Sequence, residues 1–166
     1  MDNDPDKTQI IKDISVAEFI VKAAASGLGT GYSPVASGTA GSILAAVIWW
    51  FMPELPFLKI AVTCLVLAVS VPISTAAELM YGKKDDSRIV IDEVVGMWIS
   101  LAFLPHTVKY YFAAFILFRV FDVIKPFGIR KIQSLKGGWG IVADDFFAGI
   151  LSNIVVRIAV YASSMI

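Results

Sequence analysis

The sequence predicts an all-helical protein that crosses a membrane with about four to five helices, and two observations lead to this prediction. Hydrophobic residues make up 57% of the 166 residues, charged residues make up only 17%, and the mean hydropathy is +0.75, values that lie outside the range of ordinary soluble domains. The apolar residues also gather in five runs separated by short polar loops. The length allows one domain, which we place at residues 15–166, after a polar N-terminal tail at residues 1–14.

Charge and cysteine content exclude several classes of protein. The 14 basic and 14 acidic residues cancel, so no overall charge would recruit nucleic acid. The single cysteine, Cys64, lies inside an apolar run. The chain therefore has neither an intrachain disulfide nor a cysteine-rich metal site.

A short amphipathic helix is expected to begin at Ser15. Ser15 and Glu18 have the three-residue spacing of a capping box. Apolar residues then follow at helical spacing, namely Val16, Phe19, Ile20 and Ala23. A helix of this kind would lie on the membrane surface.

The glycine-rich segment at residues 26–42, SGLGTGYSPVASGTAGS, leads directly into the first apolar run. Its last residues, Gly38 to Ser42, would form a helix N-terminus, where free backbone N–H groups and the helix dipole favour an anion. The structural alternative is a flexible connection whose small residues let helices approach closely. The first run, residues 39–52, is short against the ~20 residues that span a bilayer, so it either spans or is re-entrant.

Four further apolar runs follow along the chain. The second run covers residues 57–81, contains Pro72, and is long enough to span a bilayer. The third run covers residues 89–104, the fourth covers residues 107–124, and the fifth covers residues 144–166.

Carboxylates stand at the ends of three of these runs. Asp92 and Glu93 open the third run, Asp122 closes the fourth, and Asp144 and Asp145 open the fifth. Such groups are costly to bury in a membrane without a partner. A glycine follows each acidic pair one helical turn later and would let a neighbouring helix come close enough to share a ligand. These two glycines are Gly96 and Gly149.

Basic residues in the short loops set the expected orientation. They lie before the first run, between the second and third runs, and between the fourth and fifth runs, whereas only Lys59 and Lys109 lie on the other side. This arrangement places the N-terminus, the glycine-rich segment and the acidic run ends at the cytoplasmic face. His106, the only histidine, is expected at the opposite face.

We therefore predict a magnesium and phosphate site at the cytoplasmic face, because a site made only of carboxylate oxygens suits magnesium or manganese better than zinc. The predicted metal ligands are Glu78, Asp92, Glu93, Asp122, Asp144 and Asp145. Catalytic roles are assigned to Asp92, Glu93, Asp122 and Asp145. The predicted phosphate-binding residues are Thr39, Arg88, Arg119, Lys125 and Arg130.

These features also have structural alternatives. Arg119 and Asp122 could form an ion pair that neutralises two groups costly to bury. Asp144 and Asp145 could be helix-start charges favoured by the helix dipole. The basic residues of the loop at residues 83–88 could serve only to hold that loop on the cytoplasmic side.

Four segments together resemble the phosphatidylglycerophosphatase A family in their order and spacing. They are GTGYSPVASGTAGS, IDEVVG, FRVFDVIKPFGIRK and GGWGIVADDFFAG, and the resemblance covers nearly the whole chain from Ser26 onward. It implies a magnesium-dependent, multi-pass enzyme of the bacterial inner membrane that removes the terminal phosphate of phosphatidylglycerol phosphate to give phosphatidylglycerol. The chain departs from the family pattern at Ser37 and Gly128, where proline is expected, and at Lys136, where histidine is frequent.

Two other classes of function use similar residues. An ion channel or transporter could pass a cation along intramembrane carboxylates, and a head-group transferase could use helix-end aspartates with magnesium. Transport predicts acidic residues distributed through the membrane depth, whereas here they gather at one face, which favours chemistry on a lipid head group. For the phosphatase reaction, attack by water ranks ahead of an aspartyl-phosphate intermediate.

Overall fold

The chain folds into helices, as the sequence predicts. A computed structural model describes residues 5–126 and 135–164, with side chains described from residue 15 onward. Within these residues there are six α-helices, one 3-10 turn and no strand. The elements are α1 (Pro5–Ala25), η1 (Thr30–Tyr32), α2 (Ser37–Phe51), α3 (Pro56–Tyr81), α4 (Ile91–Leu101), α5 (Val108–Ile124) and α6 (Gly138–Ser163).

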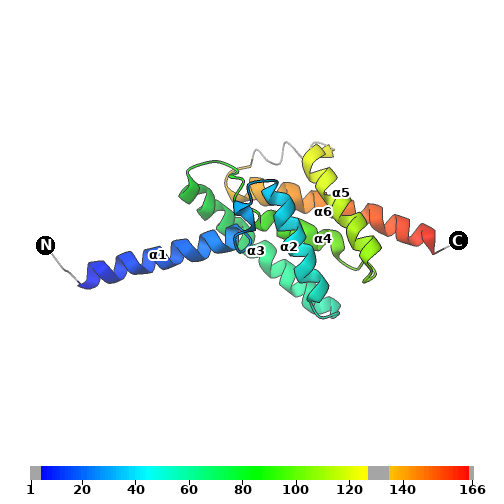
Figure 1. Ribbon diagram of the computed structural model, residues 1–166, viewed down its shortest axis with the longest axis horizontal. Coiled ribbons are helices and arrows are strands. Elements are labelled where there is room, and N and C mark those ends of the chain that lie inside the picture. The colour runs from blue at the N-terminus through cyan, green and yellow to red at the C-terminus, as the bar shows by residue number, and fades with distance from the viewer. Residues whose placement is uncertain (1–4, 127–134, 165–166) are drawn as a thin grey trace.

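The short helix α4 lies at the centre of the molecule, between α2, α3, α5 and α6, and packs against all four (Figure 1). Nine of its 11 residues are buried. At 1.5 Å per residue it is about 16 Å long, roughly half of the ~30 Å hydrocarbon core of a bilayer. We expected the run at residues 89–104 to contribute a membrane helix, but α4 is a core helix surrounded by protein.

Two helices of the described residues, α3 and α6, are long and apolar enough to cross a membrane, which is fewer than the four to five that we expected. Only 17% of the apolar window of α3 and 22% of that of α6 are buried inside the protein, so both helices turn most of their apolar surface outward. Hydropathy overcounts membrane helices here because a helix buried in protein is as apolar as one that faces lipid. The apolar helix α2 has 15 residues and the helix α5 has 17.

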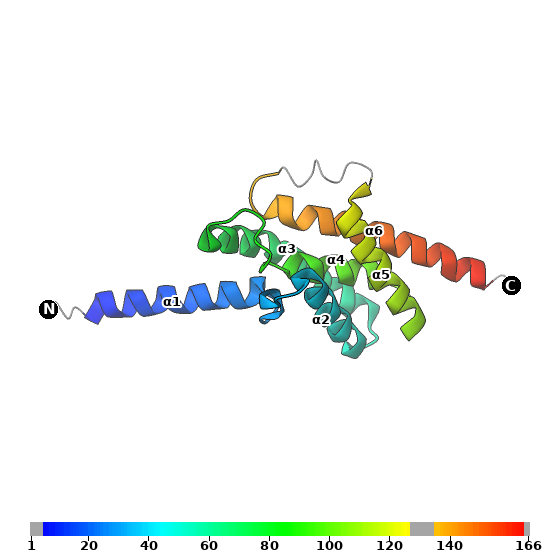
Figure 2. The same cartoon turned by 45° about the horizontal axis from the view of Figure 1, so that its top comes forward.

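Two helix starts differ from the prediction. Helix α1 begins at Pro5, ten residues before Ser15, so part of the expected N-terminal tail is helical and Ser15 does not cap a helix. Proline and Asp6 both suit the first turn of a helix, and a three-residue spacing such as that of Ser15 and Glu18 also occurs on one face inside a helix. In Figure 2, α1 projects away from the other helices, and its C-terminal part packs on α3.

Helix α6 begins at Gly138, six residues before Asp144. We expected the fifth run to begin at Asp144, but the glycines before it belong to the helix and permit close packing. A Cβ at Gly138 would overlap the carbonyl of Val71 on α3, and Thr75 Oγ1 accepts a hydrogen bond of 2.8 Å from the Gly138 N–H. Asp144 and Asp145 therefore lie in the second turn of α6 rather than at its start.

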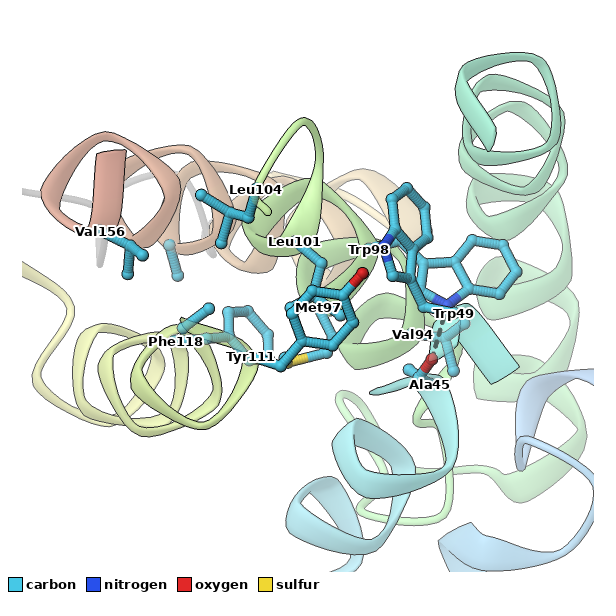
Figure 3. Close-up of a cluster of buried hydrophobic side chains, with 12 residues drawn as sticks. Ala45, Trp49, Val94, Met97, Trp98, Leu101, Leu104, Tyr111, Phe118 and Val156 are labelled. Carbon is cyan, nitrogen blue, oxygen red and sulfur yellow. Dashed lines mark hydrogen bonds between the residues drawn. The ribbon is translucent and has the colours of Figure 1, made fainter. Parts of the chain in front are cut away.

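The main hydrophobic core lies between α2, α4, α5 and α6 (Figure 3). Trp98 of α4 donates a hydrogen bond of 2.9 Å from Nε1 to the carbonyl oxygen of Ala45 on α2, and Trp49 packs beside it with ring centroids 6.2 Å apart. On the other side, Asn153 of α6 donates to the carbonyls of Ser100 and Ala102 at 3.0 and 2.8 Å. These bonds satisfy the carbonyls at the end of α4 and fix this helix between its neighbours.

Candidate metal and phosphate site

Three carboxylates from two helices meet at the N-terminal end of α4. Asp92 and Glu93 lie in its first turn and Asp145 lies on α6, and each offers an oxygen within 4.8 Å of the oxygens of the other two. Asp92 is 7% and Asp145 is 2% exposed. One oxygen of each side chain, Asp92 Oδ1, Glu93 Oε2 and Asp145 Oδ2, is buried and accepts no hydrogen bond within the described residues. We call these three side chains the acidic cluster.

Two glycines allow the helices of the acidic cluster to approach each other. A Cβ at Gly149 of α6 would overlap the carbonyl oxygen of Gly96 on α4. A Cβ at Gly96 would lie 2.8 Å from the carbonyl oxygen of Asp145 and 2.5 Å from the ring of Phe118. The spacing of these two glycines from the acidic pairs predicts this close approach, and the structure confirms it.

Helix α5 places a carboxylate and a cation beside the acidic cluster. Arg119 Nη1 lies 2.8 Å from Asp122 Oδ2 in an ion pair three residues apart. Asp122 lies close enough to Asp145 and Glu93 for their negative charges to repel one another. The ion pair weighed as a structural alternative is therefore present, and it stands beside the acidic cluster.

The N-terminus of α2 lies against the same groups. A Cβ at Gly38 would overlap Glu93 Oε1 and would lie 3.1 Å from both terminal nitrogens of the Arg119 guanidinium. Helix α2 makes its first backbone hydrogen bond from the Ala40 N–H to Ala36 at 3.1 Å, so the three preceding N–H groups, including that of Thr39, lie free of the helix ladder. Thr39 is half-buried. Free N–H groups, a helix dipole and a guanidinium together favour an anion.

Lys125 and Asp144 form a separate ion pair at the edge of the acidic cluster. Lys125 follows the last residue of α5, and its Nζ contacts Asp144 Oδ2 on α6. Asp144 is buried and has this ionic partner, whereas each member of the acidic cluster keeps one buried oxygen that accepts no hydrogen bond within the described residues. The site as a whole contains five carboxylates and two cations, which leaves negative charge in excess and favours a bound cation.

Two predicted site residues have partners other than these groups. Arg88 donates from Nε and Nη2 to Asp86 at 2.7 and 3.0 Å, and its guanidinium stacks 3.8 Å from the centre of the Tyr81 ring. These hydrogen bonds hold the pKa of the Asp86 carboxyl below its ordinary value, so the pair stays charged at neutral pH. Glu78 accepts a hydrogen bond of 3.0 Å from the N–H of Asp85. Arg130 lies outside the described residues.

Sequence reasoning missed the roles of two residues in the glycine-rich segment. Gly38 provides the space that Glu93 and Arg119 occupy. Ser42 donates to the Gly38 carbonyl at 2.8 Å and receives a contact of 3.5 Å from Arg119 Nη1. Ser42 stands at helical spacing from Gly38 and from Thr39. Thr39 was the only residue of the segment that we assigned to the site.

Comparison with known proteins places the chain in a family. The model of the phosphatidylglycerophosphatase A family matches residues 23–160. A Bacteroides thetaiotaomicron protein, provisionally named a phosphatidylinositol-3-phosphatase, is 41% identical over 145 residues, which cover 81% of this chain and 89% of that protein. The Escherichia coli phosphatidylglycerophosphatase A is 38% identical over 131 residues, with 77% of this chain and 76% of that protein covered.

The Haemophilus influenzae phosphatidylglycerophosphatase A is also 38% identical, over 138 residues that cover 80% of this chain and 83% of that protein. No solved structure matches the chain. The family model covers most of the chain, including α2, α4, α5 and the acidic part of α6. This chain therefore belongs to the phosphatidylglycerophosphatase A family and is a phosphatase.

Proposed function

We propose that the enzyme removes the terminal phosphate of phosphatidylglycerol phosphate to give phosphatidylglycerol, with magnesium as its cofactor. The observation that supports this proposal is the acidic cluster, in which three buried carboxylate oxygens that accept no hydrogen bond from the described part of the chain stand beside Arg119 and the N-terminus of α2. The names of the relatives from Escherichia coli and Haemophilus influenzae point to the same substrate. The reaction is a step of phospholipid synthesis.

The donor atoms of the acidic cluster fit magnesium. Asp92, Glu93 and Asp145 offer only oxygens, which are the ligands that hard dications prefer, and Asp122 stands beside Asp145, close enough for the two carboxylates to interact. Without a bound cation, the three buried carboxylates would repel one another, and Arg119 and Lys125 would offset only part of the negative charge of the site. When bound there, magnesium would neutralise charge on the phosphate and make the attacking water more acidic.

The residues of the chain would hold the substrate and transfer the proton. Arg119 and the free N–H groups of α2 would donate hydrogen bonds to the phosphate oxygens. Asp122 would hold the guanidinium in place through its ion pair of 2.8 Å. One carboxylate of the acidic cluster would accept the proton of the attacking water. Lys125, paired with Asp144, would add positive charge at the edge of the site.

We further propose that the protein is a multi-pass protein of the bacterial inner membrane with its site facing the cytoplasm. The apolar surfaces of α3 and α6 support an embedded protein. His106, which is expected at the far face, lies 3.7 Å from Glu54, and both residues stand away from the acidic cluster. A channel or transporter is a weaker reading, because Asp92, Glu93 and Asp145 form one compact group rather than a path across the membrane.

The orientation predicts different labelling of two lysine positions. With Cys64 replaced by serine, Lys84→Cys should stay unlabelled by a membrane-impermeant thiol reagent in whole cells, whereas Lys109→Cys should be labelled, because basic loops remain in the cytoplasm. Both lysines are exposed in the structure, so burial does not decide the outcome. Both positions should react after the cells are broken. Labelling of position 84 alone in whole cells would reverse the orientation.

The proposed reaction predicts magnesium-dependent phosphate release from phosphatidylglycerol phosphate by the purified protein. Chelation should abolish it, and magnesium or manganese should restore it, since the acidic cluster offers only oxygen ligands. Glycerol phosphate should be a much poorer substrate because it lacks the acyl chains that help to align the head group. The measurement is phosphate release in detergent micelles.

Phosphatidylinositol 3-phosphate is the informative second substrate, because the relative from Bacteroides thetaiotaomicron carries that name. Faster turnover of phosphatidylinositol 3-phosphate than of phosphatidylglycerol phosphate would show that the proposed head group is wrong. The proposal that the enzyme is a lipid phosphatase would still hold. Equal turnover of glycerol phosphate and the lipids would argue against a lipid substrate altogether.

A further inference from the structure

An apolar groove of about 410 Å³ runs between α2 and α5. Its walls include Ile43, Ala46 and Trp50 on α2, and Val108, Phe112 and Phe115 on α5. Ile43 is 51% exposed and Phe112 is 64% exposed, so the groove opens outward. In the proposed membrane setting, its open side faces lipid.

Each wall of the groove is one stripe of a helix that ends at the phosphate site. The α2 stripe consists of Thr39, Ile43, Ala46 and Trp50, and the α5 stripe consists of Val108, Phe112, Phe115 and Arg119. Residues at these spacings of four, three and four share one helix face. Both stripes therefore begin in the apolar groove and end at Thr39 and Arg119, two of the predicted phosphate-binding residues.

A contact between the two helices joins the groove to the phosphate site. Arg119 Nη1 lies 3.5 Å from Ser42 Oγ, and these residues stand one helical turn from Phe115 and Ala46 respectively. At the other end, the rings of Trp50 and Tyr111 meet edge to face with centroids 5.3 Å apart. The distance along α2 from Thr39 to Trp50 is about 16 Å, roughly half of the ~30 Å hydrocarbon core.

We infer that an acyl chain of the lipid substrate lies in this groove, and this inference rests on the proposed function. A phosphate bound at Thr39 and Arg119 places the glycerol backbone at the end of both stripes that is next to the acidic cluster. The chain then runs down one leaflet between α2 and α5 and ends near Trp50. The groove thereby selects lipid-linked phosphomonoesters and aligns the head group with the acidic cluster.

The second large apolar groove, about 460 Å³ between α3 and α6, does not lead to the site. The Gly138 N–H, at the start of α6 beside this groove, already donates a hydrogen bond to Thr75 Oγ1. Asp145 of α6 faces the acids of α4, and Asp144 faces Lys125, so neither carboxylate turns toward α3. A lipid chain in this groove would hold its phosphate away from Arg119.

The role of the α2 and α5 groove is alignment rather than added affinity. A chain that leaves lipid for an apolar protein groove gains little from hydrophobic burial, since both surroundings are apolar. A misplacement of about 1 Å at the reacting group can lower a rate by about 100-fold. Filling the groove should therefore lower the turnover of long-chain substrate selectively.

The test compares Ala46→Phe, which fills the α2 and α5 groove, with Ala68→Phe, which fills the α3 and α6 groove. Phosphate release is measured with dioleoyl phosphatidylglycerol phosphate and with the same head group on glycerol that carries no acyl chains. Ala46→Phe should lower the ratio of long-chain to chain-free turnover by about tenfold or more, and Ala68→Phe should leave that ratio unchanged. A thermal melt of each variant confirms the fold.

A second measurement uses the unaltered protein and does not depend on turnover. Phosphatidylglycerol phosphate with a photoreactive group in one acyl chain should crosslink to residues 43–50 and 108–115, while phosphatidylcholine with the same chain should label lipid-facing helices without this preference. Crosslinks concentrated on α3 and α6, or an unchanged ratio in Ala46→Phe, would overturn the inference. Absence of phosphate release from every substrate would instead refute the proposed function, and the crosslinks would still test the groove.

Discussion

Asp145→Asn should lower magnesium-dependent phosphate release by about 100-fold or more while the protein remains folded. Asparagine keeps the shape of the side chain and one acceptor oxygen, but it loses the charge that holds a hard dication. Loss of the bound metal removes several kcal/mol of transition-state stabilisation. Asp145 is 2% exposed and its Oδ2 has no hydrogen-bond partner among the described residues, so the expected loss concerns the metal rather than a disrupted network.

The thermal melt separates this account from a structural role. Removing one of several mutually repelling carboxylates should leave the metal-free variant at least as stable as the metal-free wild type. Magnesium at about 100 times its dissociation constant should raise the melting temperature of the wild type by roughly 5–10 °C. Asp145→Asn should lose most of that rise. A variant that melts early without magnesium would indicate a structural role instead.

The members of the acidic cluster should act as one unit. The double change Asp92→Asn with Asp145→Asn should be scarcely slower than either single change, because either one already removes the metal. Lys136→Ala is the contrast, since Lys136 is exposed and its attraction to anionic lipid contributes only ~1 kcal/mol. Its activity should fall at most several-fold. Near-normal activity in Asp145→Asn, or losses that multiply in the double variant, would remove Asp145 from the site.

The structure weakens the alternative in which Asp145 is only a helix-start charge. Dipole effects act within the first turn of a helix and contribute about 0.3–1 kcal/mol. Because α6 begins at Gly138, Asp145 stands in the second turn, beyond the free N–H groups. The helix dipole therefore does not explain the position of Asp145. A metal shared with Asp92 and Glu93, as proposed above, does explain it.

The sequence predicted the elements whose signals are local. The second apolar run, residues 57–81, became α3 at Pro56–Tyr81, because one long stretch of apolar residues between a proline and a glycine has few alternatives. The convergence of Asp92, Glu93 and Asp145 was also predictable, since all three stand at run ends that short loops hold at one face. The family and the phosphatase class followed from four motifs in a fixed order.

Other features depend on contacts that the sequence does not display. Arg88 donates two hydrogen bonds to Asp86, two residues away, which the sequence does not display, and its assignment to phosphate stays a prediction. The start of α6 was misplaced because the glycine of its first turn permits contact with Val71, and no local pattern distinguishes a packing glycine from a loop glycine. The membrane role of α4 was overestimated because hydropathy does not separate lipid from protein as the apolar surroundings.

Gly149→Ala should both destabilise the protein and lower its activity, although helix propensity alone predicts the opposite. Alanine in place of a mid-helix glycine stabilises an isolated helix by about 0.5–1 kcal/mol. Here the added Cβ would overlap the carbonyl oxygen of Gly96 on α4, and overpacking of this kind costs about 1–3 kcal/mol. The packing term is the larger one, so the melting temperature in detergent should fall.

The same methyl group should move the metal ligands apart. Gly149 stands one turn beyond Asp145 and Gly96 one turn beyond Asp92, so the helices can relieve the overlap only by separating at the level of the acidic cluster. A shift of about 1 Å between catalytic groups can lower a rate by about 100-fold. Gly82→Asn is the matched control, because a Cβ at Gly82 would meet no atom within 4 Å and asparagine tolerates its φ of +64°. Gly82→Asn should retain its activity, and a Gly149→Ala protein that melts higher than wild type and keeps its activity would show that α4 and α6 need no close contact to hold the site.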